Sequence, residues 1–151
     1  MRRLFLLLCL LVAVPAMGAG LLDNRPSATL GAVNNSRDFL PVSEAFKLNL
    51  IESTPTNIKL RFVPTDGYYL YQHRFAFKTD PADITLGPVQ LPPGEPKHDE
   101  YFGDVQVYHG IVDVDVPRPA DAQRAFTLVV TYQGCADKGL CYPPETVRLT
   151  I

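Results

Sequence analysis

The sequence predicts an all-β protein, an antiparallel β-sandwich of immunoglobulin-like type. Short segments alternate apolar and polar residues with a period of two, which is typical of strands that bury one face. Turn-rich pieces such as STPT, PTDG, TDPAD and LPPGEP separate them. The chain holds 14 prolines in 151 residues, and each interior proline removes a hydrogen bond from a helix. About six or seven strands at this spacing indicate a sandwich.

The strand pattern is clearest in six segments. In chain order they span residues 45–52, 57–63, 68–78, 105–116, 125–134 and 146–151. In the second segment Ile58, Leu60 and Phe62 share one face, whereas Lys59 and Arg61 take the other, so one face is expected to be buried. The SEAF piece just before the first segment has a capping-box pattern and predicts one helical turn.

The first 19 residues have the pattern of a cleaved secretory signal peptide. An apolar run, Leu4–Val14, follows two arginines and precedes small residues at Gly18 and Ala19. The run is short for a membrane span, which makes an uncleaved anchor the weaker alternative. Cys9 lies inside the run and would be removed with it. We expect residues 1–19 to be the signal and the mature domain to begin at residue 20.

The charge of the mature chain argues against two classes of partner. Removal of the signal leaves 12 basic and 16 acidic residues, a net charge of −4. This balance does not suggest a surface for nucleic acid or for anionic membranes. Export places the domain in a compartment where disulfides form and persist, and a periplasm is the expected location.

The stretch YQGCADKGLCYPPET contains Cys135 and Cys141, with five residues between them. An immunoglobulin-type disulfide would instead join cysteines many tens of residues apart, beside a buried tryptophan. This chain has no tryptophan. The pair is therefore expected to close a short loop between two neighbouring strands, with Gly139 turning the chain.

Three interpretations of this pair are open from its spacing. A zinc site normally needs four ligands, and His73, His98 and His109 lie on other segments. A structural disulfide that closes seven residues would stabilise the fold by only ~2–2.5 kcal/mol. A redox-active disulfide is the third interpretation, because exposed or strained disulfides are the labile ones. Spacing alone favours the structural disulfide over the redox couple and makes the metal site the weakest.

The residues around Cys135 and Cys141 resemble a known family. YQGCADKGLCYPPET is similar to the active-disulfide motif of the periplasmic N-terminal domain of the DsbD thiol:disulfide interchange family. DGYYLY, residues 66–71, resembles the family's strand that runs past the cysteines. HDEYFGDVQVY, residues 98–108, resembles its capping loop. The motifs occur in the family's order, and the resemblance covers residues 20–151.

The resemblance implies a redox domain over residues 20–151. Its activity would be that of a thiol–disulfide oxidoreductase of the protein-disulfide reductase type, acting as a stoichiometric electron carrier. Cys141 matches the cysteine that forms the mixed disulfide with partners, and Cys135 matches the resolving one. No cofactor and no metal are expected for this exchange.

The same resemblance implies the partners. Electrons would arrive from a thioredoxin-like protein linked to a membrane reductase. They would leave to oxidised periplasmic proteins, such as disulfide isomerases and the thioredoxins of cytochrome c maturation. The full-length family protein continues into a membrane domain and a thioredoxin-like domain, whereas this sequence ends at Ile151. We therefore expect either a free-standing shuttle or a domain whose companion parts are encoded separately.

Four residues are expected to form the surroundings of the disulfide. Tyr69 and Tyr71 lie two apart on a strand and share a face, and the resemblance places both near the cysteines. Their hydroxyls would be in reach of Asp99 or Glu100. Negative neighbours disfavour a thiolate, and no basic motif adjoins Cys141, so the reduced pair would be a poor nucleophile until a partner docks. In an unmatched sequence the HDE stretch would be interpreted as a solvated acidic turn.

The capping loop is expected over Tyr101, Phe102 and Gly103. Tyr101 occupies the position at which the family usually carries phenylalanine as a lid over the disulfide. A phenol has more reason than phenylalanine to face water, so Phe102 is the substitute candidate, either as the lid or as a buried anchor.

One function of another class stays open at this point. The chain would then be a non-redox periplasmic β-sandwich that binds a ligand and keeps a structural disulfide. The observation that separates the two is whether a thioredoxin-like donor reduces the Cys135–Cys141 pair.

Overall fold

The computed structural model describes residues 38–118 and 124–151, so the expected signal peptide at residues 1–19 lies outside the described residues. Ten strands and two short helical turns make up this part of the chain. The elements are α1 Val42–Ala45, β1 Phe46–Ser53, β2 Asn57–Pro64, β3 Tyr68–Tyr71, a 3-10 turn Gln72–Arg74, β4 Ala76–Asp80, β5 Glu95–Asp99, β6 Gly103–Tyr108, β7 Val112–Pro117, β8 Thr127–Tyr132, β9 Gly134–Ala136 and β10 Glu145–Thr150.

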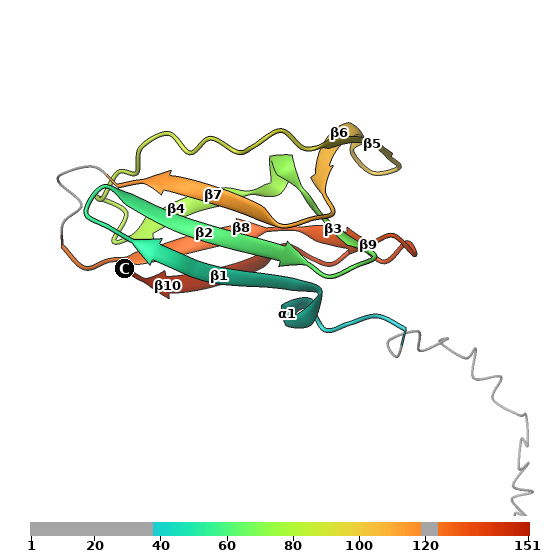
Figure 1. Cartoon of the computed structure of the whole chain (residues 1–151), viewed down its shortest axis with the longest axis horizontal. Helices are drawn as coiled ribbons and strands as arrows, with labels where there is room; N and C mark the ends of the chain where they lie inside the picture. The colour runs from blue at the N-terminus through green and yellow to red at the C-terminus, as the bar shows by residue number, and fades with distance from the viewer. Residues whose placement is uncertain (1–37, 119–123) are drawn as a thin grey trace, which may run out of the picture. The chain divides into compact units, whose positions relative to one another are not determined.

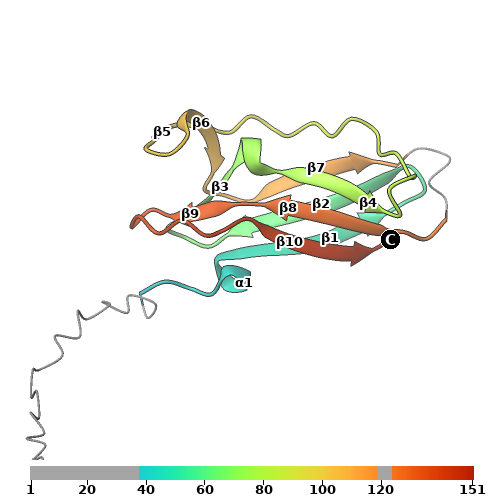
Figure 2. The same ribbon diagram turned by 180° about the vertical axis from the view of Figure 1, so that it is seen from behind.

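Two antiparallel sheets face each other and form the body of the sandwich. One has the strand order β1-β2-β7 and the other has the order β10-β8-β4. Figure 1 shows β1 and β2 in front, and Figure 2 shows β10 and β8 in front after the molecule is turned. A third sheet, β5-β6-β3-β9, forms one end of the domain. The predicted immunoglobulin-like antiparallel β-sandwich is confirmed.

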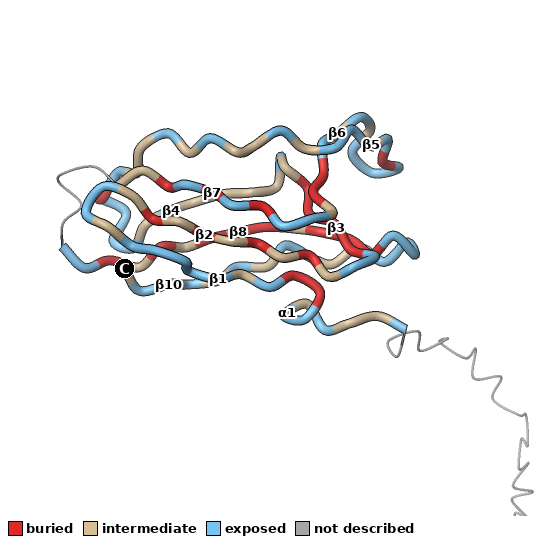
Figure 3. Tube along the Cα trace, in the orientation of Figure 1, coloured by how far each residue is buried: buried red, intermediate tan, exposed pale blue. Residues whose placement is uncertain are grey.

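The main core lies between the two facing sheets. Ile58, Leu60 and Phe62 on β2 are buried, while the side chains between them are half-exposed. Leu128 and Val130 on β8 are buried in the same way from the opposite sheet. Figure 3 shows this alternation as red segments along both strands. The period-two pattern therefore predicted the buried face of β2 correctly.

The expected strand at residues 68–78 is broken in the structure. A 3-10 turn, Gln72–Arg74, separates β3 from β4 and sends the two strands into different sheets. The Gln72 side-chain amide donates to the carbonyl of Pro92 at 2.7 Å and lies 2.9 Å from the hydroxyl of Tyr108. These contacts come from distant parts of the chain, which is why local alternation did not reveal the break.

The segment expected at 105–116 is also divided, because β6 ends at Tyr108 and β7 begins at Val112. In addition, β5 pairs with β6 in an antiparallel hairpin, although its sequence EPKHD had been assigned to a turn and loop.

The helical turn expected at SEAF is present as α1, but without a side-chain capping bond at its start. None of the helices in the described ranges is long and apolar enough to cross a membrane.

A second, smaller cluster of buried side chains lies on the other face of β3. Its members are Tyr69, Tyr71, Val107 and Cys135, with Val105 and Cys141 packed against them. Tyr68 and Leu70, which alternate with the two tyrosines, belong instead to the main core. The alternation along β3 thus separates a structural face from a face that contacts the cysteines.

Candidate functional site

Cys135 and Cys141 are joined by a disulfide with a sulfur–sulfur distance of 2.08 Å and a Cα–Cα distance of 4.0 Å. The two residues face each other as an antiparallel bridge. The backbone N–H of Ala136 donates to the carbonyl of Leu140 at 2.7 Å, and the N–H of Tyr142 donates to the carbonyl of Gly134 at 3.0 Å. These bonds flank the cysteines rather than join them, and such non-hydrogen-bonded pairs bring side chains closest together.

Glycine at position 134 allows β9 to lie close to β3. A Cβ atom at this position would lie 2.3 Å from the carbonyl oxygen of Tyr69 and 2.7 Å from the ring of Phe46. Only a residue without a side chain fits this approach. The close contact places Cys135 directly opposite Tyr69 in the β3–β9 pairing.

The two cysteines differ in their access to solvent. Cys135 is fully buried, with 0% of its surface exposed, whereas Cys141 is half-exposed. Cys141 also lines a depression of about 250 Å³ beside the β5–β6 hairpin. The other lining residues are Tyr69, Lys97, His98, Asp99, Glu100, Tyr101 and Gly139. Of the two cysteines, Cys141 is therefore the one that an attacking group in this depression would meet.

The hydroxyl of Tyr71 lies at the centre of the buried polar contacts. It donates to Oδ2 of Asp99 at 2.5 Å and lies 3.2 Å from Sγ of Cys135 and 3.9 Å from Sγ of Cys141. The hydroxyl of Tyr69 is 3.5 Å away. Burial, followed by the bond to Asp99, raises the pKa of Tyr71 above its ordinary value. Tyr71 therefore stays protonated, and its one hydrogen is already committed to the carboxylate.

Asp99 is a buried acid, with 7% of its surface exposed. Its Oδ1 accepts hydrogen bonds from the backbone N–H groups of Tyr101 at 2.8 Å and Phe102 at 3.0 Å. Burial alone would raise its pKa. The bonds from Tyr71, Tyr101 and Phe102, together with the charge of Lys97, outweigh burial and hold the pKa of Asp99 below its ordinary value. The carboxylate is thus ionised beside the disulfide and anchors the loop that follows it.

The capping loop places its two aromatic side chains differently. Tyr101 lines the depression with Cys141 and is 72% exposed. Phe102 is 40% exposed, and its ring centroid lies 5.1 Å from that of Tyr71 and 5.0 Å from that of His73. Gly103 has a φ of 70°, a backbone conformation that favours glycine and turns the chain into β6.

The predicted acidic pair is divided by the structure. Asp99 accepts a hydrogen bond from the hydroxyl of Tyr71, whereas Glu100 is exposed and lines the depression. Tyr69 contacts the hydroxyl of Tyr71 and lies beneath the ammonium of Lys97, whose Nζ is 4.7 Å from the ring centroid. Of the two predicted carboxylates, Asp99 is the one that contacts the buried cluster.

Sequence reasoning missed two basic residues at this site. Lys97 lines the depression with Cys141, although no basic group had been expected next to that cysteine. His109 had been regarded only as a residue on another segment, but its ring contacts Glu95 and lies 5.3 Å from the ring of Tyr69. The available signal was spacing, because Glu95, Lys97 and Asp99 alternate along β5 and share a face. Recognising β5 as a strand would have placed Lys97 on the same face as Asp99.

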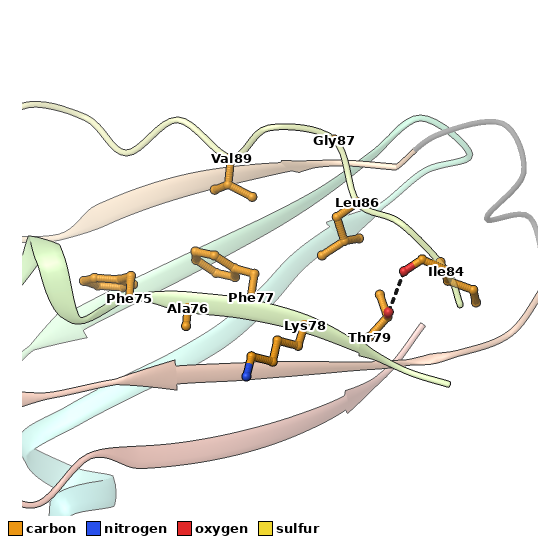
Figure 4. Close-up of a pocket in the computed structure, with 9 residues that line it drawn as sticks. All are labelled: Phe75, Ala76, Phe77, Lys78, Thr79, Ile84, Leu86, Gly87 and Val89. Carbon is orange, nitrogen blue, oxygen red and sulfur yellow. Dashed lines mark hydrogen bonds between the residues drawn. The ribbon is translucent and has the colours of Figure 1, made fainter. Parts of the chain in front are cut away.

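The described residues contain no group of three or more histidine, cysteine or acidic side chains arranged to hold a metal ion. A separate pocket of about 350 Å³ lies between β4 and residues 84–89 (Figure 4). It is lined largely by apolar side chains, such as Phe77 and Leu86, and a bond from the hydroxyl of Thr79 to the carbonyl of Ile84 closes one end. Neither cysteine contributes to its lining.

Fold and site together define a class, namely immunoglobulin-like domains built around a cysteine pair at a strand end, next to a buried tyrosine–aspartate contact and an aromatic loop. The model of one family matches residues 36–151, and its description is "Thiol:disulfide interchange protein DsbD, N-terminal". This chain belongs to that family. The resemblance inferred from the motifs is therefore confirmed.

Individual relatives agree with the family match. Thiol:disulfide interchange protein DsbD 1 of Pseudomonas aeruginosa is 58% identical over 151 residues, which cover 100% of this chain and 25% of that protein. DsbD 2 of the same organism is 41% identical and is matched over 24% of its length. The chain thus spans about a quarter of the length of these curated relatives.

Solved structures support the same assignment. The reduced N-terminal domain of DsbD from Neisseria meningitidis has 41% sequence identity and a TM-score of 0.71, covering 78% of this chain and 92% of that one. The complex between the DsbD N-terminal and PilB N-terminal domains of the same organism gives 42% identity and a TM-score of 0.65, covering 76% and 88%.

Proposed function

We propose that this domain exchanges disulfides with thiol proteins through the Cys135–Cys141 couple and acts as a stoichiometric carrier of two electrons. The observation that supports this proposal most directly is the asymmetry of the pair. Cys141 is half-exposed and lines a depression, while its bonded partner Cys135 is buried within the tyrosine cluster. Exchange requires access to one sulfur and retention of the other as the leaving and resolving group.

In the reductive half of the cycle, a donor thiolate attacks Sγ of Cys141. The disulfide breaks, and Cys135 leaves as a thiolate that takes up a proton. A second thiolate of the donor then attacks the donor's own sulfur in the mixed disulfide, and Cys141 leaves and is protonated. The donor is oxidised to a disulfide, and two electrons and two protons reside on the cysteine pair.

The oxidative half runs in the opposite direction. Cys141 loses its proton and attacks one sulfur of an oxidised acceptor, whose second sulfur leaves as a thiolate. Cys135 then attacks Cys141 in the mixed disulfide, re-forms the internal bond and releases the acceptor as a dithiol. The distance constraint on this step is already met, because the two Cα atoms are 4.0 Å apart.

The surroundings favour protonated thiols in the unbound, reduced domain. The ionised carboxylate of Asp99 opposes a second negative charge nearby. Tyr71 is 3.2 Å from Cys135, but its hydrogen is donated to Asp99 at 2.5 Å. Its oxygen is therefore oriented to accept from a thiol rather than to donate to a thiolate. A partner that displaces Tyr101 and Phe102 would change this balance, so the capping loop acts as a lid that restricts exchange to docked proteins.

Domain limits and location are part of the same proposal. Residues 1–19 serve as an export signal, and residues 20–151 form the redox domain in the periplasm. The donor is a thioredoxin-like protein linked to a membrane reductase, and the acceptors are thioredoxin-like proteins such as disulfide isomerases and those of cytochrome c maturation. A relative of 42% identity that was solved in complex with a PilB N-terminal domain supports a protein partner for this domain.

Equilibration in a glutathione series tests the proposal. The purified domain is held at graded ratios of reduced to oxidised glutathione, and the thiols are counted by alkylation and mass measurement. We expect a reversible two-electron transition, and we expect the reduced domain to transfer both electrons to an oxidised thioredoxin-fold protein. A pair that stays oxidised at every ratio and with every thioredoxin-like donor would instead support a binding module with a structural disulfide.

A further inference from the structure

His109 joins two parts of the site that are distant in sequence. It directly follows β6 and is half-exposed. Its Nδ1 lies 3.1 Å from Oε2 of Glu95, and its Nε2 lies 3.2 Å from Oδ1 of Asp137. Its ring centroid is 5.3 Å from that of Tyr69. Both ring nitrogens therefore contact a carboxylate, and each carboxylate comes from a different element.

The number of N–H groups on the ring decides how many of these two contacts can be hydrogen bonds. An ionised carboxylate only accepts hydrogen bonds, so each of the two contacts needs an N–H on the ring. A neutral imidazole has one N–H and can satisfy one carboxylate, whereas the imidazolium has two and satisfies both. The bridge between Glu95 and Asp137 is complete only when His109 carries its positive charge.

The two arms of this bridge lead to two different elements near the disulfide. Glu95 begins β5, and β5 ends at Asp99, which holds the capping loop through its backbone contacts. Asp137 lies in the loop between the cysteines, four residues before Cys141. Both elements contribute residues to the depression that Cys141 lines.

Other charged groups near His109 do not replace the bridge. Lys97 on β5 lies over the same Tyr69 ring, with its Nζ 4.7 Å from the ring centroid. Tyr69 on β3 presents an aromatic ring that pairs with either cation. Glu95 and Asp137 are therefore the two anionic groups that hold the imidazole from the hairpin and from the disulfide loop.

We propose that His109 is a positioning residue that, when protonated, ties the β5–β6 hairpin to the disulfide loop and narrows access to Cys141. Loss of its second proton breaks one arm and lets the two sides separate. Access to the disulfide is therefore greater with the neutral imidazole, which leaves one of the two carboxylates without a donor. The inference rests on the proposed function for its role in exchange, but the geometry it describes can be tested without a protein partner.

The test compares reduction of the oxidised domain and of His109→Gln by a neutral phosphine, tris(3-hydroxypropyl)phosphine, between about pH 5.5 and pH 8.5. The ratio of the two rates at each pH removes the pH dependence of the reductant itself. Because exposed ion pairs are weak, we expect the variant to react about 3-fold faster at the acid end. The ratio should fall to about one at the alkaline end, where the wild-type bridge is also open.

Matched variants separate the bridge from general effects of charge. Asp137→Asn should accelerate reduction at acid pH, and the double variant with His109→Gln should be no faster than the faster single variant, because both remove the same contact. Asp113→Asn removes the carboxylate that pairs with Arg61 within the β1-β2-β7 sheet, and it should leave the rate ratio at one. Circular dichroism spectra establish that each variant is folded.

The outcomes are distinct. A rate ratio that is the same at every pH would mean that the imidazole acts only by packing, and additive effects of the two single variants would mean that Asp137 acts independently; either result overturns the inference. A domain that follows the predicted rates with phosphine but fails to exchange with any thiol protein would refute the proposed function and leave the positioning role of His109 in place.

Discussion

Tyr71 donates its phenolic hydrogen to Oδ2 of Asp99 over 2.5 Å, and both side chains are buried next to the disulfide. The contact satisfies the hydroxyl and the carboxylate together, which matters because a buried polar group without a partner is costly. It also links β3, which carries the tyrosine, to the end of β5. The cysteine surroundings and the capping loop are therefore joined by one hydrogen bond.

Replacement of Tyr71 by phenylalanine should destabilise the domain. Asp99 would lose one of its three hydrogen-bond donors while staying buried, and a deleted partner of a buried charged group costs ~1–3 kcal/mol. The pKa of Asp99 should rise, because the bond from Tyr71 is the largest of the contacts that lower it. Urea unfolding at neutral pH measures the first effect, and a carbon-detected NMR titration of the carboxyl group measures the second.

Tyr69→Phe is the matched control for that substitution. The hydroxyl of Tyr69 makes a 3.5 Å contact with that of Tyr71, which is at the weak end of the range for hydrogen bonds. Its removal should change stability less than Tyr71→Phe does, and it should leave the pKa of Asp99 nearly unchanged. Equal losses from the two variants would contradict the central position assigned to the Tyr71 hydroxyl.

The ionised state of Asp99 should make stability dependent on pH. Its pKa is lower in the folded protein than in the unfolded chain, despite burial, because Tyr71 and two backbone N–H groups stabilise the charge. Such a group stabilises the fold fully above the unfolded pKa, about 3.9. This contribution is lost as the pH falls through the lower folded pKa.

Asp99→Asn isolates this contribution, since asparagine keeps an oxygen for the backbone bonds of Tyr101 and Phe102. The difference in unfolding free energy between wild type and variant should be constant above about pH 5 and shrink at lower pH. Urea unfolding from acid to neutral pH provides the measurement. A difference that grows on acidification would mean that Asp99 is protonated in the native state.

The fold was predictable where burial follows a local period. Along β2, alternation identified Ile58, Leu60 and Phe62 as core residues, because one face of that strand is covered by the opposite sheet. The strand β5 escaped prediction because its sequence, EPKHD, contains no apolar alternation. It is held by backbone pairing with the neighbouring strand β6, and the alternation of side chains does not report such pairing.

The placement of side chains around the cysteines was predictable only in part. The spacing of Tyr69 and Tyr71 correctly assigned both to one face of β3, and that face contacts Cys135. The sequence did not decide whether Asp99 or Glu100 accepts their hydrogen bonds, because only the folded hairpin brings Asp99 inward. His109 was missed because its two carboxylate partners lie 14 and 28 residues away.

The two cysteines should behave differently when each is left alone. With Cys135→Ser, the half-exposed Cys141 should trap a mixed disulfide with a thioredoxin-fold partner, because this residue lines the depression. With Cys141→Ser, the fully buried Cys135 should trap little. Non-reducing electrophoresis after incubation with the oxidised partner quantifies both adducts. Trapping mainly through Cys135 would reverse the assigned roles.

Loss of the disulfide should cost little stability. Closing a loop of this length stabilises the fold by only ~2 kcal/mol on the chain-entropy model, and the sandwich core lies outside it. Cys135→Ala and Cys141→Ala should therefore each stay folded while abolishing electron transfer. Thermal unfolding and the thiol-transfer assay are compared on the same samples. A variant that unfolds at room temperature would favour the structural interpretation of the pair.

The capping loop should control how fast small reductants reach the disulfide. Tyr101 borders the depression and is 72% exposed, so Tyr101→Ala removes part of its wall without opening the core. Reduction by dithiothreitol should become several-fold faster, and the equilibrium potential should change little, since access alters the rate and not the end states. Stopped-flow reduction and a glutathione titration supply the two measurements.

Phe102→Ala should act on stability as well as access. Phe102 packs on the rings of Tyr71 and His73, so its truncation removes contacts that position the loop over the buried cluster. Because Phe102 is 40% exposed, the loss of stability should be ~1–2 kcal/mol, which is below the cost of truncating a fully buried phenylalanine. Urea unfolding of the two variants separates the roles. Tyr101→Ala should leave the midpoint unchanged while accelerating reduction, whereas a large loss of stability from Tyr101→Ala and none from Phe102→Ala would exchange the assignments of lid and anchor.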